Sequence, residues 1–323
     1  PYLSGQKTIS VPTNRRAQPL HPQHPMLEIV NARHNNLRGI TVRIPLGTFT
    51  AITGPSGSGK SSLILDTLHA GAARVLNGAR VIAGPHDRIT GLEMCDKVVE
   101  IDQSPLGRNS RSNPATASGL WNEIRRLFAR TRDARLRGFR SARFSFNAAG
   151  GRCEACRGQG VHRVSMQFLP DLEVVCPACQ GARFNAQTLH VRFRGKSVAQ
   201  ILDLRIADAL AFFDGFAAIQ RQLQTFVDVG LGYLTLGQSA ATLSGGESQR
   251  IKLATELGGA NAGPTLYVLD EPTVGIDPQS RSNLLDGVRE LSRQGVGGAL
   301  CLTLHGRNRS RLPSRGDHRP RPI

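Results

Sequence analysis

The chain has 323 residues, with 41 Lys and Arg against 24 Asp and Glu, so its formal net charge is +17. Such a surplus repels itself unless anions are near, and Arg, which outnumbers Lys here, pairs bidentately with phosphate. Nucleic acid is therefore the favoured partner, although a compositional bias of the source genome could explain part of the excess. No apolar run approaches the roughly 18 residues that a membrane span needs, and no apolar signal core opens the chain. We therefore expect no membrane partner and a cytoplasmic location.

Residues 1–25 contain Pro and basic residues without periodicity and are predicted to be a linker. Residues 26–103 are predicted to form the first part of an α/β ATPase core. Short alternating runs predict strands at Leu27–Val30, Ile40–Ile44 and Phe49–Ile52. A Gly-rich turn and a helix over about Ser61–Leu76 follow them, and this order opens an α/β nucleotide-binding fold.

Residues 104–235 are predicted to be an insertion, with a metal-binding module at about 150–185. An Arg-rich helical segment over 125–143 precedes the module. A strand at Leu189–Phe193 and helices near Val198–Leu202 and Ile206–Phe213 follow it. Residues 236–306 return to α/β character, and 307–323 form an atypical basic tail.

A phosphate-binding loop is predicted at residues 54–61, which fit G-x-x-x-x-G-K-[ST] at every fixed position. Its glycines let backbone N–H groups turn toward phosphates, and the next helix directs its positive N-terminus at them. Lys60 can reach the β- and γ-phosphates of ATP, and the Ser61 hydroxyl can ligate Mg²⁺. The predicted nucleotide-binding residues here are Gly54, Pro55, Ser56, Gly57, Ser58, Gly59, Lys60, Ser61 and Ser62.

Two further segments complete a nucleotide site. The apolar run Thr265–Leu269 ends in Asp270, which can hold Mg²⁺, and Glu271, which can polarise an attacking water. Taken alone, this run could be a strand entering a turn. Ser244 begins a capping box ahead of an apolar helix, and Ser244, Gly245 and Gly246 can face a γ-phosphate. Taken alone, that segment could be only a well-capped helix.

In this order the three segments resemble an ATP-binding-cassette (ABC) ATPase. In that family two cassettes pair head to tail, and the signature segment of one, here Leu243–Arg250, closes over the nucleotide of the other. The resemblance implies that Gln103 is the Q-loop glutamine, which couples the γ-phosphate to the attached module. An ordinary polar residue after a strand is the alternative.

Two C-x-x-C pairs lie within the predicted insertion, Cys153 with Cys156 and Cys176 with Cys179. Turns of this kind can place four thiolates around one Zn²⁺, and four protein ligands leave no open position for catalysis. We therefore predict a structural zinc site. Free thiols or a redox pair are the alternatives.

Long segments outside the ATP motifs resemble the UvrA family of excinuclease ATPases, specifically its C-terminal cassette. The matching segments are Ile101–Arg108, Arg111–Thr116, Arg143–Asn147, Gly151–Cys156, Phe168–Asp171 and Val227–Tyr233. The resemblance implies ATP-regulated recognition of damaged double-stranded DNA in nucleotide excision repair, by a protein whose partners are a second cassette and a UvrB-like subunit. It also implies that His305, after a short apolar strand, senses the γ-phosphate.

The Arg-rich segment and the flanking residues Arg108, Arg111 and Arg143 are candidates for sequence-independent contacts with the DNA backbone. A solvated helix face is the alternative for such a run. Two other functions stay open at this point. One is the ATPase component of a transporter, and the other is a hydrolysis-deficient chain that binds only nucleotide or DNA.

Overall fold

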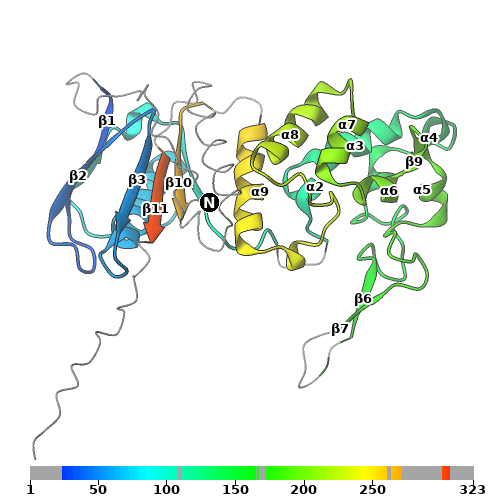
Figure 1. Ribbon diagram of the computed structural model, residues 1–323, viewed down its shortest axis with the longest axis horizontal. Coiled ribbons are helices and arrows are strands. Elements are labelled where there is room, and N and C mark those ends of the chain that lie inside the picture. The colour runs from blue at the N-terminus through cyan, green and yellow to red at the C-terminus, as the bar shows by residue number, and fades with distance from the viewer. Residues whose placement is uncertain are drawn as a thin grey trace, which may run out of the picture.

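The computed structural model describes residues 24–107, 111–164, 166, 172–259, 263–270 and 300–305. Within them, a sheet region and a helical region lie side by side, and a β-hairpin projects from the helical region (Figure 1). No helix among the described residues is long and apolar enough to cross a membrane.

The sheet region contains seven strands among the described residues. They are β1 (Met26–Ala32), β2 (Ile40–Pro45), β3 (Phe49–Gly54), β4 (Arg88–Thr90), β5 (Lys97–Ile101), β10 (Thr265–Asp270) and β11 (Leu300–His305). Its helices are the π-helix η1 (Ser62–His69), α1 (Ala70–Leu76) and the 3-10 turn η2 (Leu92–Met94). The strands predicted near 27–30, 40–44 and 49–52 and the helix predicted over 61–76 are confirmed.

The helical region is built from short helices and two small strand pairs. Its helices are α2 (Pro114–Ala117), α3 (Leu120–Ala129), α4 (Arg132–Leu136), η3 (Ser141–Phe144), α5 (Ala186–His190), α6 (Val198–Leu202), α7 (Ile206–Phe212), α8 (Ala217–Asp228), η4 (Ala240–Thr242) and α9 (Gly245–Gly258). Its strands are β6 (Val161–Val164), β7 (Leu172–Val175), β8 (Arg192–Phe193) and β9 (Lys196–Ser197). The hairpin β6–β7 is the projecting element of Figure 1.

The strands of the sheet region form two sheets. In one, β1 pairs antiparallel with β2 and β4. In the other, the order is β3-β11-β10-β5 and every pairing is parallel. Because all four strands run the same way, their carboxyl ends meet at one edge, where ligands bind in sheets of this kind.

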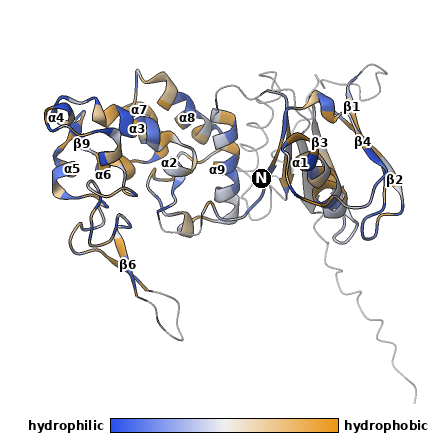
Figure 2. Ribbon diagram, turned by 180° about the vertical axis from the view of Figure 1, so that it is seen from behind, coloured by the Kyte–Doolittle hydropathy of each residue, from blue (hydrophilic) through white to orange (hydrophobic). Residues whose placement is uncertain are grey.

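The central strand β10 is covered on both faces. Leu266 and Val268 pack with η1 and α1, whereas Tyr267 and Leu269 pack into the core of the helical region. A parallel strand buried on both faces must be almost wholly apolar, which explains the run before Asp270. The helix α9 lies between the sheet and the other helices (Figure 1). Figure 2 shows hydrophilic and hydrophobic stretches on both α8 and α9. In α8 the buried residues Ile219, Leu223 and Phe226 share one face, as expected of a surface helix, whereas no residue of α9 is fully exposed because the helix is flanked on both sides.

Two predicted elements of the insertion differ from the structure. The Arg-rich segment is not one helix. The Thr131 hydroxyl accepts a hydrogen bond from the Ala134 amide and so caps the start of a new helix, α4, and Gly138 adopts a left-handed φ of 65° after that helix ends. The predicted strand at Leu189–Phe193 is wrong over its first half. There the Asn185 side chain accepts a hydrogen bond from the Thr188 amide and starts helix α5, so only Arg192–Phe193 form a strand.

Candidate functional site

The four parallel strands end in the residues that the sequence predicts for a nucleotide site. Gly54 ends β3, His305 ends β11 and Asp270 ends β10. Gln103 follows two residues after the end of β5. The register pairs His305 with Gly54, Asp270 with Thr303 and Leu269 with Ile101. The fold therefore gathers four segments at one edge, although they are separated by up to 251 residues along the chain (305 − 54).

The loop after β3 has the backbone expected of a phosphate-binding loop. Gly57 and Gly59 adopt φ values of 78° and 93°, in the left-handed region that favours glycine. A side chain at Gly59 would place its Cβ 2.8 Å from Asn36 Oδ1 and 2.8 Å from Leu37 Cδ2. The Asn36 amide also donates to the Gly57 carbonyl at 2.8 Å. Asn36 and Leu37 thus support the loop, and nothing in their sequence context indicated this role.

Lys60 is held inside this loop. It is 8% exposed, and its ammonium donates to the carbonyl oxygens of Gly54 at 3.0 Å and Pro55 at 2.9 Å. Ser61 is exposed, whereas Ser62 is buried and its hydroxyl accepts a hydrogen bond from Asn35 at 2.9 Å. The loop therefore holds the Lys60 ammonium against its own carbonyl oxygens and leaves Ser61 exposed, while Ser62 supports the fold of the loop.

The signature segment starts α9. The Ser244 hydroxyl accepts from the Glu247 amide, and the Glu247 carboxylate accepts from the Ser244 amide at 2.7 Å, which completes the predicted capping box. The Tyr233 hydroxyl, which the sequence did not indicate, donates to the same carboxylate at 2.5 Å. Burial opposes ionisation of Glu247, but hydrogen bonds from Tyr233 and Ser244 outweigh it and lower its pKa.

Gln103 lies against the start of the same helix. A Cβ added to Gly245 would lie 3.1 Å from Gln103 Oε1 and 3.3 Å from its Cβ. Glycine at this position therefore allows the signature helix and the strand end of β5 to approach closely. Glu271, the predicted water-polarising residue, lies outside the described residues, as do Arg108, linker residues 1–23 and tail residues 307–323.

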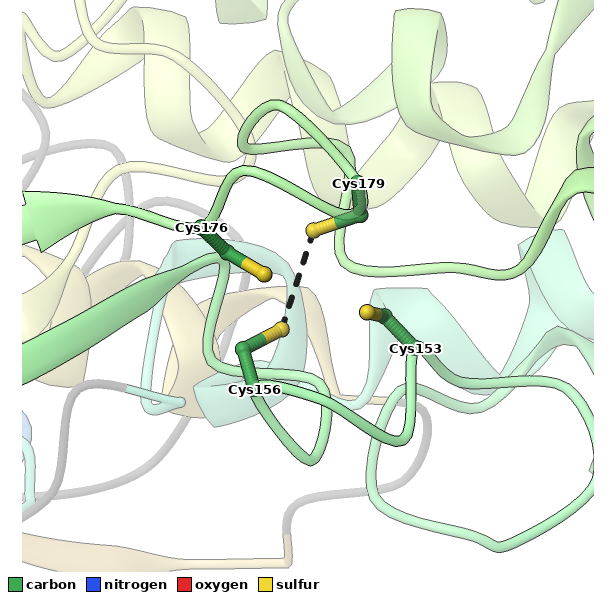
Figure 3. Close-up of side chains that lie close together, drawn as sticks. All are labelled: Cys153, Cys156, Cys176 and Cys179. Carbon is green, nitrogen blue, oxygen red and sulfur yellow. Dashed lines mark hydrogen bonds between the residues drawn. The ribbon is translucent and has the colours of Figure 1, made fainter.

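The four predicted metal ligands come together beside the hairpin β6–β7. The sulfur atoms of Cys153, Cys156, Cys176 and Cys179 all lie within 4.8 Å of one another and point toward a common centre (Figure 3). The Cys156 and Cys179 sulfurs are 3.7 Å apart. A tetrahedral thiolate site with metal–sulfur distances of about 2.3 Å has sulfur–sulfur edges of about 3.8 Å. The geometry thus fits one metal ion with four thiolate ligands.

The thiols of this cluster differ in acidity. Burial raises the pKa of Cys176, but the amides of Cys179 and Ala178 outweigh this and bring its pKa to about 6. Burial, followed by its neighbouring thiols Cys156 and Cys176, raises the pKa of Cys179 to about 12. Since thiolates packed this closely repel one another, a cation is needed to hold all four in the deprotonated state.

Arg183 joins the cysteine cluster to the helical region, and the sequence did not indicate it. Its carbonyl accepts from the Cys153 amide at 2.9 Å, and its guanidinium donates to the Gly237 carbonyl at 2.9 Å. The guanidinium also lies 5.5 Å from the centre of the Phe146 ring. Burial lowers the pKa of the Arg183 guanidinium, and the nearby Asp203 carboxylate partly opposes that shift.

The predicted DNA-binding arginines have different surroundings. The Arg143 guanidinium donates to Thr188 Oγ1 at 3.0 Å and to Gln187 Oε1 at 2.8 Å, so part of its donor capacity is used within the protein. Arg111 lines a polar hollow of about 340 Å³ beside Asn147. The segment around α3 and α4 carries a larger set of exposed arginines, namely Arg126, Arg130, Arg132, Arg135, Arg137 and Arg140.

Comparison with known proteins gives a consistent result. The chain is 52% identical over 294 residues to UvrABC system protein A of Deinococcus radiodurans, and the matched region covers 91% of this chain and 28% of that protein. It is 50% identical over 294 residues to UvrABC system protein A of Bacillus subtilis, again over 91% of this chain and 30% of that protein. The crystal structure of UvrA2 from Deinococcus radiodurans superposes with a TM-score of 0.84 at 43% identity, covering 94% of this chain and 36% of that one.

No family model matches the chain. The chain spans about 30% of the length of the curated relatives that it matches. The predicted α/β fold of ABC type and the resemblance to UvrA are confirmed by these relatives.

Proposed function

We propose that this chain, which matches part of UvrABC system protein A over 91% of its length, is an ATP-hydrolysing cassette that couples nucleotide binding to double-stranded DNA in nucleotide excision repair. The observation that carries the proposal is the convergence of Gly54, His305, Asp270 and Gln103 at one edge of a parallel sheet. A role on DNA would place the chain in the cytoplasm.

The loop at residues 54–61 is the proposed site for the phosphates of ATP. Its left-handed glycines turn the backbone there, and a phosphate oxygen can replace the Gly54 and Pro55 carbonyls that now accept from Lys60. Ser61 and Asp270 would hold Mg²⁺, which neutralises phosphate charge when bound. Glu271 and His305 would orient the water and sense the γ-phosphate, and Ser244, Gly245 and Gly246 would contact the nucleotide of a second cassette.

We also propose that Cys153, Cys156, Cys176 and Cys179 hold a structural Zn²⁺. Sulfur-only ligands favour zinc over harder divalent ions, and the cluster is stabilised by the amide of Gly160, which donates to the Cys156 sulfur at 3.3 Å. Because all four ligands come from the protein, the ion would fix the base of the hairpin and would not perform catalysis.

The DNA contacts are proposed for Arg108, Arg111, Arg143 and the arginines around α3 and α4. Such contacts to phosphate are independent of sequence, so binding should weaken steeply as salt is raised. A UvrB-like subunit is the proposed protein partner, since the relatives are named as protein A of a UvrABC system.

Complementation between two inactive variants tests the head-to-tail site. Lys60→Ala removes the phosphate ligand, and Ser244→Arg blocks the signature serine, so each variant alone should hydrolyse no ATP. In a mixture, a heterodimer has one site that combines the intact loop of one chain with the intact signature of the other. When equal amounts are mixed and pair at random, half of the dimers contain both variants, and each of these has one intact site of two. The mixture should therefore recover about a quarter of wild-type activity.

Three outcomes are distinguishable. Restored activity that rises faster than linearly with protein concentration, and rises further with damaged DNA, supports the proposal. An active Lys60→Ala variant refutes the assignment of the loop. Nucleotide binding without turnover by the wild-type chain, at any concentration, shows instead that the chain only binds nucleotide.

A further inference from the structure

Helix α9 buries several polar side chains, and they reach different neighbours: Gln249 contacts the strand ends of the sheet, whereas Arg250 donates to the carbonyls of Val229 and Gly230 after α8. Ser248, Gln249 and Arg250 are 1%, 1% and 5% exposed, beside the apolar residues Ile251 and Leu253. Burying polar groups is unfavourable unless they form hydrogen bonds, so the partners of these side chains indicate what the helix is built to hold.

Gln249 joins the carboxyl ends of two neighbouring strands. Its side-chain amide donates to the carbonyl of Ile101 at 2.8 Å and to the carbonyl of Asp270 at 2.8 Å. Ile101 ends β5 and Asp270 ends β10, two strands that pair in parallel. The segments that continue from these two ends carry Gln103 and Glu271, so one side chain fixes the separation at which both begin.

Lys252 lies three residues further along, on the same side of the helix. Its ammonium contacts the Asp102 carboxylate and donates to the Ser104 carbonyl at 2.8 Å and the Ser104 hydroxyl at 2.7 Å. The Ser104 hydroxyl in turn donates to Asp102 at 2.9 Å. Gly245, at the start of the helix, packs on Gln103 itself. Residues 101–104 are therefore attached to α9 along its first turns.

We propose that Gln249 and Lys252 are positioning residues that join the signature helix to the loop at residues 101–104 and to the end of β10 as one rigid unit. The inference rests on the proposed ATPase function. In a head-to-tail pair, Ser244 at the tip of α9 meets the nucleotide of the other cassette, whereas Gln103 faces the chain's own nucleotide. Contact with one nucleotide would thus be transmitted to the hydrolysis geometry of the other site.

Replacing Lys252 tests this connection, and the chain offers a matched control. Lys97 also joins β5 to α9 through a lysine–carboxylate pair, with Glu256 at 2.9 Å, but at the opposite end of the strand from the nucleotide edge. Lys252→Met should lower kcat for ATP about tenfold, with KM and nucleotide affinity within about twofold of wild type. Lys97→Met should leave kcat and KM within about twofold, and Lys252→Arg should recover most of the loss.

Equal effects of Lys252→Met and Lys97→Met on kcat would overturn the inference, as would a Lys252→Met variant that changes only KM. Gln249→Met, which removes both strand-end hydrogen bonds, should reproduce the loss of kcat. Failure of that variant to fold does not affect the lysine comparison.

Hydrogen–deuterium exchange tests the same connection and does not require the chain to hydrolyse ATP. At protein concentrations low enough to keep the chain monomeric, ATP with Mg²⁺ can contact the segment at residues 101–104 but not the start of α9, which would need a second cassette. Under these conditions ATP should slow amide exchange in residues 101–104 and, through the connection, in residues 245–252 of the wild-type chain and of Lys97→Met. In Lys252→Met, only residues 101–104 should respond. If both segments respond equally in Lys252→Met, the inference is wrong. If the wild-type chain folds and binds ATP but hydrolyses none, the proposed function fails while this comparison still decides the inference.

Discussion

Gly158 lies two residues after Cys156, at a point where the cysteine cluster meets the core of the helical region. Its φ is 80°, and a Cβ there would lie 1.8 Å from the Phe146 carbonyl oxygen and 2.8 Å from the Phe146 carbonyl carbon. Phe146 is 1% exposed and packs on Trp121 and Phe184, with ring centres 5.8 Å and 6.0 Å away. The Phe146 backbone therefore has little room to move away from an added methyl group.

The cost of Gly158→Ala follows from two contributions. A left-handed conformation costs a residue with a Cβ about 1–2 kcal/mol, and forcing atoms into a packed core costs about 1–3 kcal/mol more. We expect Gly158→Ala to lower the free energy of unfolding by about 2–5 kcal/mol. The variant should also release zinc to a chelator faster, since the strained turn carries Cys153 and Cys156.

Gly181 supplies a matched control, because it occupies the same place after Cys179 and has a φ of 84°. A Cβ there would meet only Val175 Cγ1, at 3.9 Å, so Gly181→Ala should cost about 1–2 kcal/mol, the conformational part alone. Urea unfolding followed by tryptophan fluorescence, which reports Trp121 beside Phe146, measures both variants. Equal losses in the two variants would refute the steric argument.

Three other changes have defined outcomes. Cys176→Ser should abolish stoichiometric zinc measured by elemental analysis, whereas Cys95→Ser, which alters a buried thiol in the sheet region, should retain it. Burial opposes ionisation of Asp102, but Lys252 and Ser104 outweigh it and lower its pKa. The stabilisation that ionised Asp102 provides is therefore complete above the unfolded pKa, near pH 4, and is lost as pH falls through the lower folded pKa. On acidification below about pH 4, the Lys252→Met variant should consequently lose less folding stability than the wild-type chain. Tyr233→Phe removes one hydrogen bond to Glu247 and should lower the thermal midpoint by about 2–4 °C, with a larger drop arguing that Tyr233 has a further role.

The sequence by itself determined the features that depend on short spacing. The loop at residues 54–61 could be recognised because consecutive residues supply its turns, its lysine and the helix after it. The capping box of Ser244 and Glu247 and the two C-x-x-C turns are local in the same way. The run before Asp270 was recognisable because a parallel strand buried on both faces must be apolar.

Local sequence patterns gave wrong predictions where the same composition is compatible with two kinds of secondary structure. The residues at 189–193 have strand-like composition, but the Asn185 side chain satisfies the Thr188 amide and makes a helix turn more favourable there. Similarly, the Arg-rich segment reads as one helix until the Thr131 cap and Gly138 interrupt it.

Only the tertiary structure decided which polar residues work together. Gln249 reaches Ile101 across 148 positions, and Lys252 reaches Asp102 across 150, so no spacing rule links them. Asn36 supports the glycine loop, and Arg183 joins the cysteine cluster to Gly237, for the same reason. The sequence specifies each local motif through short-range sterics and hydrogen bonding, whereas the relative placement of the motifs follows from the burial of β10 between two apolar cores and of α9 against one of them.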